Sequence, residues 1–377
     1  MKKKIIRSVT VDGSLGFVEP MIPYLKDKYD LQILSSPGKH IDEVCRKYEL
    51  VGHRVYMYRR ISPFKDLRSL WQLIKVFRRE RPDMVHSMTP KAGLLCMVAA
   101  WITRVPRRIH TFTGLVWPTA KGLSRRLLMF TDWVTCACAT HIIPEGQGVK
   151  DDLSHVTKKQ MRVLGYGNVR GVDMAQFSRR PEIMVAASKM RDDGCFTFIF
   201  VGRIVGDKGI NELVAAFCAL LEKYPNIRLR LVGTFENALD PLKPETMDLI
   251  KQNNEVIELL GAKYGEDLIV CYAASDCLVF PSYREGFPNV VLEAGAMGLP
   301  SIVTDINGSR EIVSQGENGI IVPPRDKDTL YGAMEQMLID KAATKRMAEQ
   351  ARSMIASRFE RGYVCKCLYD FYDEIMN

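Results

Sequence analysis

Residues 277–294 have the sequence Cys-Leu-Val-Phe-Pro-Ser-Tyr-Arg-Glu-Gly-Phe-Pro-Asn-Val-Val-Leu-Glu-Ala. The apolar run over residues 277–281 predicts a buried β-strand. A helix is predicted to begin near Pro288, because proline is well tolerated in the first turn of a helix. Between them lies a short loop that contains Gly286. A strand, a glycine-containing loop and a helix in this order are typical of doubly wound sheets, which bind ligands at such turns.

The loop and the helix start carry polar groups that suit a phosphorylated sugar. Backbone N–H groups at a helix start, together with the positive end of the helix dipole, attract an anionic phosphate. Glu285 lies in the loop, and Glu293 lies more than a turn inside the predicted helix. Carboxylates accept pairs of hydrogen bonds, so both glutamates suit vicinal sugar hydroxyls. Taken alone, two glutamates at this spacing are more often solvated surface charges.

A second segment, residues 201–209, also follows a predicted strand and precedes a predicted helix. Its glycines allow the backbone to approach a ligand, and Arg203 and Lys208 supply two cations five residues apart. A guanidinium fork and an ammonium together suit a diphosphate. The spacing differs from that of a P-loop, which argues against an ordinary ATPase. Alone, the segment could equally be a glycine turn with two surface cations.

Strand-like and helix-like segments alternate along the whole chain, which is the pattern of parallel α/β layers. We predict two Rossmann-like domains, residues 1–166 and residues 167–360. A final helix over residues 361–377 is expected to pack back on the first domain. The longest apolar stretch, residues 92–102, is too short to span a membrane. The predicted strands are residues 5–11, 31–35, 54–57, 84–87, 108–111, 141–144, 196–201, 228–232, 256–260, 277–281, 301–304 and 319–322.

The first half offers weaker candidates for a site. Gly13 and Gly16 lie in a glycine-rich turn after the first strand, and His110 follows a later strand at the same predicted sheet edge. A lone histidine is usually structural, so the sequence alone leaves its role open. Asp326-Lys327-Asp328 resembles a metal-binding motif, but it precedes a helix and predicts a helix cap. We therefore expect no metal. The ten cysteines lack metal-type spacing and are expected to be free thiols of a reducing cytosol.

The net charge of +9 is unevenly distributed. Residues 1–180 hold 32 Lys/Arg against 15 Asp/Glu, and the rest of the chain holds 21 against 29. A basic half predicts an anionic partner, either phospholipid or nucleic acid. No RNA-binding module or aromatic platform is recognisable, so no nucleic acid is expected. Basic side chains interleave with apolar ones in two segments, which suits helices lying on an anionic membrane or, alternatively, helices covering their own sheet. The basic residues are Arg59, Arg60, Lys65, Arg68, Lys75, Arg78, Arg79, Arg81, Lys121, Arg125 and Arg126.

Together these segments resemble the family-4 glycosyltransferases, which are retaining enzymes of the GT-B architecture. Glu285 and Glu293 match the E-x7-E element of that family, and Arg203 with Lys208 matches its diphosphate-binding pair. Residues 168–177 resemble its interdomain segment, with a two-residue insertion. The resemblance spans nearly the whole chain and is densest over residues 198–322. Within that family, the chain resembles most closely the enzymes that build bacterial surface polysaccharides on polyprenyl diphosphate carriers.

The resemblance implies that the two domains face each other across a cleft, with the acceptor side in residues 1–166 and the nucleotide-sugar in residues 167–360. It also implies a role for each candidate residue. Glu293 would hold the donor ribose, and Glu285 a hydroxyl of the transferred sugar. Arg203 and Lys208 would stabilise the leaving diphosphate, and His110 would reach the sugar from the first domain. Backbone groups that would approach the donor lie at Gly13, Gly16, Phe287, Pro288, Asn289 and Val290. Pro288 stands where many relatives have glycine and removes one N–H, so Asn289 and Val290 must supply the donors.

The expected reaction is transfer of a hexosyl or N-acetylhexosaminyl group from a nucleotide diphosphate donor, a UDP-sugar, with retention of configuration. The expected acceptor is a polyprenyl-diphosphate-linked glycan of capsule or polysaccharide biosynthesis, at the cytoplasmic face of the membrane. No cofactor or metal is expected. Two alternatives stay open: a sugar-nucleotide epimerase of the same architecture, and a non-catalytic nucleotide-sugar-binding subunit.

Overall fold

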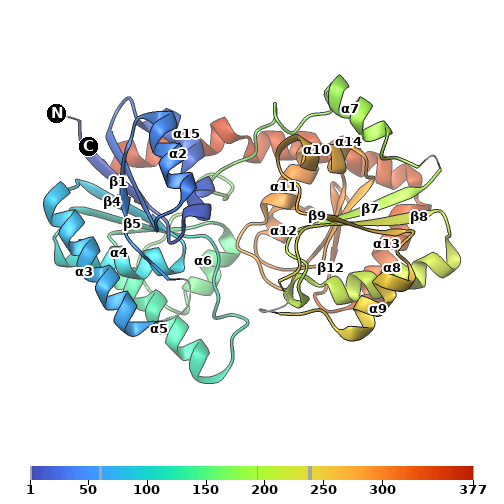
Figure 1. The fold of residues 1–377 in the computed structure, drawn as a ribbon, viewed down its shortest axis with the longest axis horizontal. Helices are drawn as coiled ribbons and strands as arrows, with labels where there is room; N and C mark the ends of the chain where they lie inside the picture. Colours follow the sequence, from blue (N-terminus) through green and yellow to red (C-terminus); the bar gives the residue numbers. More distant parts are fainter. Residues whose placement is uncertain (1, 59–61, 193, 237–239, 377) are drawn as a thin grey trace. The chain divides into compact units, whose positions relative to one another are not determined.

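The computed structural model describes residues 2–58, 62–192, 194–236 and 240–376. The chain forms two compact units, of which the first comprises Met1–Gly171 and Arg361–Asn377 and the second Val172–Glu360 (Figure 1). The division falls a few residues after the predicted one. In both units every strand is parallel to its neighbours and helices cover both faces of the sheet. The predicted GT-B class, two doubly wound α/β sheets, is confirmed.

In unit 1 the described residues form a six-stranded sheet with the order β3-β2-β1-β4-β5-β6. The chain builds outward from β1 to β3 and then returns to place β4 beside β1, so the topological switch point lies between β1 and β4. The strands are β1 (Lys4–Ser8), β2 (Asp30–Ser35), β3 (Val51–Arg54), β4 (Met84–Met88), β5 (Arg107–Phe112) and β6 (His141–Pro144).

Helices cover both faces of this sheet. On one face α3 packs against α4 and α4 against α5, over a core that includes Ile6 (Figure 1). On the other, α15 contacts α1, over a core that includes Ile5. Neighbouring residues of β1 thus point to opposite cores, as the pleat requires. The helical segments are η1 (Asp12–Phe17), η2 (Glu19–Met21), α1 (Ile22–Leu25), α2 (Lys39–Tyr48), α3 (Pro63–Glu80), α4 (Pro90–Ile102), α5 (Gly122–Cys138), α6 (Gln147–Leu153) and α15 (Arg361–Met376).

Unit 2 repeats this plan with the strand order β12-β11-β10-β7-β8-β9 among its described residues. Here β10 pairs with β7, so the switch point lies between them. Its strands are almost wholly apolar because helices bury both faces of a parallel sheet. The strands are β7 (Phe196–Val201), β8 (Ile227–Val232), β9 (Ile257–Gly261), β10 (Cys277–Phe280), β11 (Ser301–Thr304) and β12 (Gly319–Val322).

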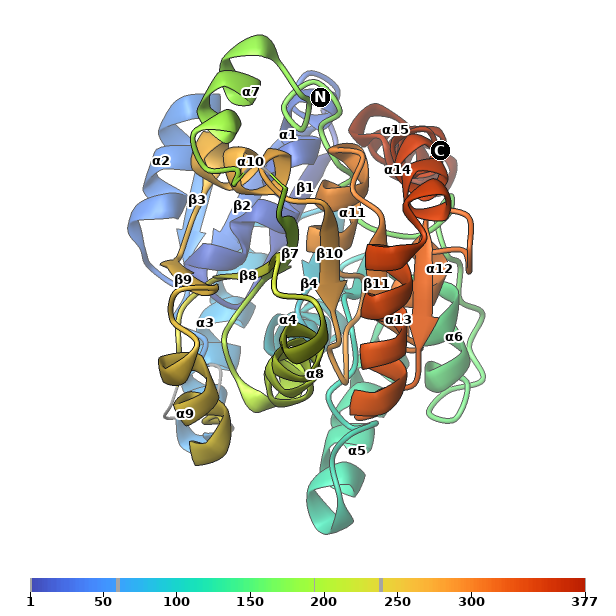
Figure 2. The ribbon, with the colours of Figure 1, turned by 90° about the vertical axis from the view of Figure 1, so that its right-hand side faces the viewer.

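The helices of unit 2 share one continuous core with its sheet. Figure 2 shows α8 and α13 lying side by side, and α11 packs against α14. The helical segments are α7 (Pro181–Ser188), η3 (Gly206–Lys208), α8 (Ile210–Lys223), α9 (Pro244–Gln252), α10 (Gly265–Ala273), α11 (Asn289–Ala296), α12 (Ser309–Ile312), α13 (Lys327–Ile339) and α14 (Lys341–Phe359).

One predicted strand was misplaced. The sequence predicted residues 54–57, whereas β3 is Val51–Arg54. Val55 and Met57 are buried and apolar, which produced the error, but they lie beyond the ladder in which β3 pairs with Gln32–Ser35. In the described part of the chain no helix is long and apolar enough to cross a bilayer.

Candidate active site

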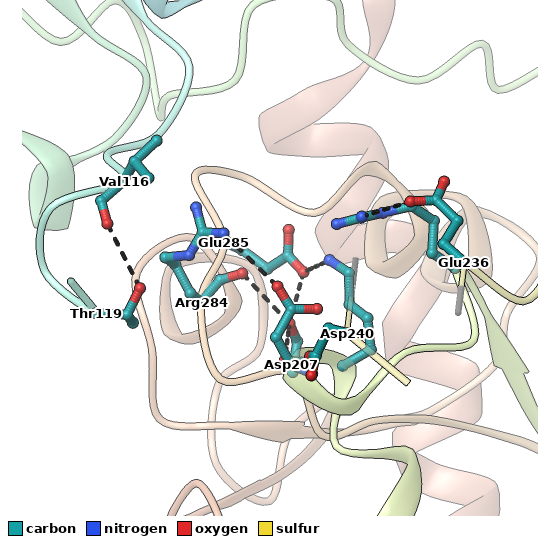
Figure 3. A network of polar contacts seen from close by, with 10 residues as sticks. Val116, Thr119, Asp207, Glu236, Asp240, Arg284 and Glu285 are labelled. Carbon is teal, nitrogen blue, oxygen red and sulfur yellow. Dashed lines mark hydrogen bonds and ion pairs between the residues drawn. The ribbon is translucent and has the colours of Figure 1, made fainter. Parts of the chain in front are cut away.

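The strongest sequence signals of unit 2 meet at its switch point. The loop after β7 carries Lys208 and the loop after β10 carries Glu285, and these two strands are neighbours in the sheet. The backbone N–H of Tyr283 donates to the carbonyl of Asp207 at 2.9 Å, which ties the two loops together. Arg284 adds an ion pair with Asp207 at 3.6 Å (Figure 3). Both candidate segments thus belong to one site.

Lys208 and Glu285 form an ion pair between Lys208 Nζ and Glu285 Oε1. The Ser282 hydroxyl donates to the same carboxylate oxygen at 2.7 Å. The side chains of the pair are only 12% and 17% exposed, and Lys208 Nζ lies 5.5 Å from the centre of the Phe280 ring. A cation and a carboxylate are therefore held side by side with little solvent around them. Their roles towards a donor stay predictions.

Two glycines permit this close approach of loops. Gly209 has φ +72°, and a Cβ there would lie 2.1 Å from the carbonyl oxygen of Pro281. Gly308, just before α12, has φ +74°, and a Cβ there would lie 2.3 Å from the carbonyl oxygen of Gly286. Positive φ and the lack of a Cβ are what glycine supplies. The sequence signalled Gly209 as part of the Lys-Gly pair, but Gly308 was missed.

Arg203 lies apart from this ion pair. Its Nη1 is 3.0 Å from Glu236 Oε2, and both side chains are about one-third or more exposed. It lines an open pocket of about 260 Å³ at the carboxyl ends of β7 and β8. Tyr264, which is exposed, offers an aromatic face there. The sequence did not reveal this pocket, because its walls come from three separate loops. They are Val201, Gly202, Arg203, Val232, Gly233, Thr234, Ala262, Lys263, Tyr264 and Leu268.

The start of α11 carries the remaining candidates of unit 2. Glu293 is 7% exposed, and the hydroxyl of the buried Tyr272 donates to its Oε2 at 3.2 Å. Pro288 is the N-cap of α11, so the first N–H groups of this helix belong to Asn289 and Val290. The Phe287 side chain is buried, with its ring centre 5.4 Å from that of Phe359. Phe287 therefore serves the core, and only its backbone remains a candidate for ligand contact.

In unit 1, Gly13 and Gly16 lie in η1, directly after β1. A Cβ at either glycine would meet nothing within 4 Å, so packing inside the unit does not require glycine there. The neighbouring Asp12 holds the turn, since its carboxylate accepts from the backbone N–H groups of His40 at 3.0 Å and Ile41 at 2.6 Å. The approach of this turn to a ligand stays a prediction.

His110 is buried on β5, with Nδ1 2.9 Å from Ser87 Oγ. Burial lowers the pKa of His110 to about 3, so the imidazole is neutral at physiological pH. A Cβ on Gly93 of α4 would lie 2.3 Å from His110 Cε1, so this glycine makes room for the ring. His110 lines a small pocket with Pro90, Phe112, Thr113, Gly114, Val116, Leu128, Thr131 and Asp132. It can act there only as a neutral hydrogen-bonding group.

The predicted cap is confirmed. Asp326 is the N-cap of α13, and its carboxylate accepts from the backbone N–H of Thr329 at 2.9 Å. That hydrogen bond lowers the pKa of Asp326. The described residues hold no group of three or more side chains that could bind a metal ion. The ten cysteines are free thiols.

The outer surface of α3, α4 and α5, here called the α3–α5 face, exposes apolar and basic side chains together. Basic residues lie between the apolar ones, and Lys75 Nζ is 3.4 Å from the centre of the Trp71 ring. Two of the basic residues predicted for this surface, Arg59 and Arg60, lie outside the described residues. The exposed apolar side chains are Phe64, Leu67, Trp71, Trp101, Ile102, Leu123, Leu127, Phe130 and Trp133.

Comparisons with known proteins agree with this architecture. Residues 186–354 match the family model for glycosyl transferases group 1, and residues 27–167 match that for a glycosyl transferase 4-like domain. In fold, the chain is similar to Anabaena HepE in complex with UDP, with a TM-score of 0.82 at 17% identity over 98% of this chain and 100% of the other.

Two relatives are closer in sequence. A capsular polysaccharide biosynthesis glycosyltransferase of Staphylococcus aureus is 32% identical over 99% of this chain and 98% of its own. An Escherichia coli UDP-Gal:α-D-GlcNAc-diphosphoundecaprenol α-1,3-galactosyltransferase is 30% identical over 80% of this chain and 78% of its own. With two family models that together cover most of its length and a relative that is 32% identical over 99% of it, this chain belongs to the family-4 glycosyltransferases of the GT-B architecture.

Proposed function

We propose that this glycosyltransferase moves a hexosyl or N-acetylhexosaminyl group from a UDP-sugar to a polyprenyl-diphosphate-linked glycan, in the synthesis of a capsular or other bacterial polysaccharide. The observation that carries the proposal is the shielded pair of Lys208 and Glu285 at the switch point of unit 2. The Escherichia coli relative, which uses UDP-Gal and a diphosphoundecaprenol-linked acceptor, supports the substrate classes.

The pair suits the chemistry of a departing diphosphate. Negative charge develops on the β-phosphate as the bond to the sugar breaks, and Lys208 is already held where little water competes for it. In the proposed complex, phosphate oxygens replace Glu285 as the partner of Lys208. Glu285 then accepts a hydrogen bond from a hydroxyl of the transferred sugar. Arg203 supplies a second cation from the same loop.

We propose retention of configuration by attack from the side of the departing phosphate, which also takes the acceptor proton. Retaining glycosidases instead use a carboxylate nucleophile paired with a second carboxyl group across the reacting bond. Here Glu285 is bound by Lys208 and Ser282, and Glu293 is buried against Tyr272. Both glutamates are thus suited to hold hydroxyl groups, Glu293 those of the ribose. The pocket beside Tyr264 suits the nucleobase, which could stack on the aromatic ring.

We propose that the α3–α5 face binds the anionic cytoplasmic leaflet, where a polyprenyl-linked acceptor resides. Unit 1 holds 32 Lys/Arg against 17 Asp/Glu, and unit 2 holds 21 against 27. Each basic residue near an anionic leaflet contributes about 1 kcal/mol, over a Debye length of roughly 8 Å. Several cations with exposed Trp71 and Phe64 should therefore bind the membrane reversibly.

Vesicle flotation tests the membrane part of the proposal. The protein should float with phosphatidylglycerol-containing vesicles at low salt and be released at high salt. Replacing Arg68, Lys75, Arg78 and Arg79 together by Gln should abolish flotation and leave UDP affinity unchanged. Replacing four exposed lysines of unit 2 is the matched control. Equal binding to neutral and anionic vesicles, or none to either, would contradict the assignment.

The enzymatic part is tested in two steps. A thermal-shift screen of UDP-, GDP- and ADP-sugars should select UDP-sugars, because a ligand that binds the folded state raises its stability. Labelled UDP-galactose should then give product with undecaprenyl-diphosphate-linked N-acetylglucosamine, also in the presence of EDTA. Isomerised UDP-sugar without acceptor would indicate an epimerase, and binding without turnover a non-catalytic subunit. Activity lost in EDTA and restored by Mn²⁺ would contradict the metal-free mechanism.

A further inference from the structure

Asp132 of α5 is a partly buried carboxyl group that the mechanism above does not use. The hydrogen-bonding side chain that faces its carboxyl group is the indole of Trp117. That indole is buried, and its Nε1 has no other hydrogen-bond partner among the described residues. A carboxyl group has two oxygens and about four acceptor sites, so one indole contact leaves most of its hydrogen-bonding capacity unused, and a partly buried group in this state calls for an explanation.

Two cations of this region, both among the described residues, are held by other groups. Arg125, on the same helix, lies over the ring of Trp117 with its guanidinium carbon 5.4 Å from the ring centre. Lys159 directs its ammonium to three carbonyl groups, those of Cys136, Ala137 and Ala139, each at 2.8 Å. Burial accordingly raises the pKa of Asp132 to about 7, and the Trp117 indole opposes this shift.

The Asp132 side chain and His110 line the same small pocket. Its walls come from the end of β5, the loop after it, the first residue of α4 and one side of α5, so it lies at the carboxyl edge of the sheet of unit 1. The volume open to a water-sized group is about 30 Å³. One water molecule needs roughly 10–15 Å³ of such open volume. The pocket therefore has room for one hydroxyl or hydroxymethyl group and not for a sugar ring.

We propose that Asp132 and His110 form a subsite for a single hydroxyl group of a sugar substrate. A hydroxyl both donates and accepts, which suits a carboxyl group on one side and a neutral imidazole on the other. The hydroxyl belongs either to the transferred sugar or to the acceptor sugar, and the experiment distinguishes the two. The inference rests on the proposed glycosyl transfer, because it assigns the pocket to a substrate of that reaction.

The test compares Asp132→Asn and Asp132→Ala with Asp151→Asn, a change of an exposed aspartate on α6, as the control. Kinetic constants are measured with UDP-galactose and the undecaprenyl-diphosphate-linked acceptor, and UDP affinity by calorimetry. We expect kcat/KM to fall about 10- to 100-fold in Asp132→Ala, and less in Asp132→Asn, because the amide can still form a hydrogen bond. The melting temperature of Asp132→Asn should not fall, whereas a structural role would lower it. UDP affinity and the control should be unchanged.

Deoxy analogues identify the hydroxyl. Removing the hydroxyl that Asp132 binds should slow the wild-type enzyme but have little further effect on Asp132→Ala. If the effects overlap in this way for a deoxy-UDP-sugar, the subsite holds the transferred sugar, and if they do so for a deoxy-acceptor, it holds the acceptor. Full activity in Asp132→Ala, or no such overlap with any analogue, would overturn the inference. Wild-type protein that binds UDP but transfers no sugar would instead contradict the proposed function.

Discussion

Separating Lys208 from Glu285 should affect stability and turnover in different ways. We consider Lys208→Met, Glu285→Gln and the double variant. Removing one partner of a buried ion pair costs about 3–5 kcal/mol, because the other charge is left without compensation. The side chains here keep 12% and 17% exposure and Ser282 still donates to Glu285, so we expect about 2–3 kcal/mol for Lys208→Met. In the double variant no charge is left uncompensated, and most of this loss should be recovered.

Turnover should not recover with stability. Losing one group that stabilises a developing anion slows reactions by about 100- to 1000-fold, and Lys208→Met should do so alone and in the double variant. Urea unfolding measures the stability, and transfer of labelled sugar measures the rate. The more exposed pair of Lys223 and Glu335 is the matched control, for which the same cycle should give a coupling below about 1 kcal/mol. A coupling energy below about 1 kcal/mol between Lys208 and Glu285 would refute this reasoning. Restored turnover in the double variant would refute it as well.

Three further variants test other parts of the site. Glu293→Ala should weaken UDP binding by about 1.5–3 kcal/mol in calorimetry, and unchanged affinity in the folded variant would exclude Glu293 from the donor site. Gly308→Ala should lower the free energy of unfolding by about 1–3 kcal/mol and should also lower kcat. The reason is that residue 308 has a positive φ and its new Cβ would collide with the carbonyl oxygen of Gly286. An unchanged urea unfolding curve would contradict that close approach. The pKa of Asp132 rises from 3.8 to about 7 on folding. Its carboxyl group therefore does not destabilise the folded state below pH 4, and the loss of folding free energy grows as the pH rises to 7. At 1.36 kcal/mol per pKa unit the full shift would correspond to about 4 kcal/mol, and we expect about half of this because the carboxyl group is partly exposed. The stability of Asp132→Asn relative to wild type should therefore rise by that amount between pH 4 and pH 8. A stability difference that does not change with pH would contradict the raised pKa of Asp132.

The local parts of the fold could be predicted from sequence because each depends on a short pattern. The strand, loop and helix around Glu285 follow from an apolar run, a glycine and a proline within residues 277–294. The cap at Asp326 depends on a contact only three residues away. The limits of β3 were less accurate, since burial continues to Met57 while the pairing with β2 ends at Arg54.

The geometry of the site depends on distant parts of the chain and could not be predicted in the same way. Lys208 and Glu285 are 77 residues apart, and they meet because β10 returns to the side of β7. The pocket beside Tyr264 needs three loops, and the clash that requires Gly308 involves another loop. Asp132 carries no motif at all, and only its burial beside the pocket that His110 lines distinguishes it from an ordinary helical aspartate.

The ion pair has a consequence for how a donor would bind. Lys208 and Glu285 neutralise each other, so neither leaves an isolated charge in a shielded site before the substrate arrives. A diphosphate alone could replace Glu285 at Lys208 but would leave that carboxylate without its cation. A nucleotide-sugar can bring a hydroxyl to Glu285 as it brings phosphate to Lys208, and so can compensate both groups at once. On the proposed roles of the two residues, we expect the arrangement to favour the intact donor over the nucleoside diphosphate product, which would assist product release after transfer.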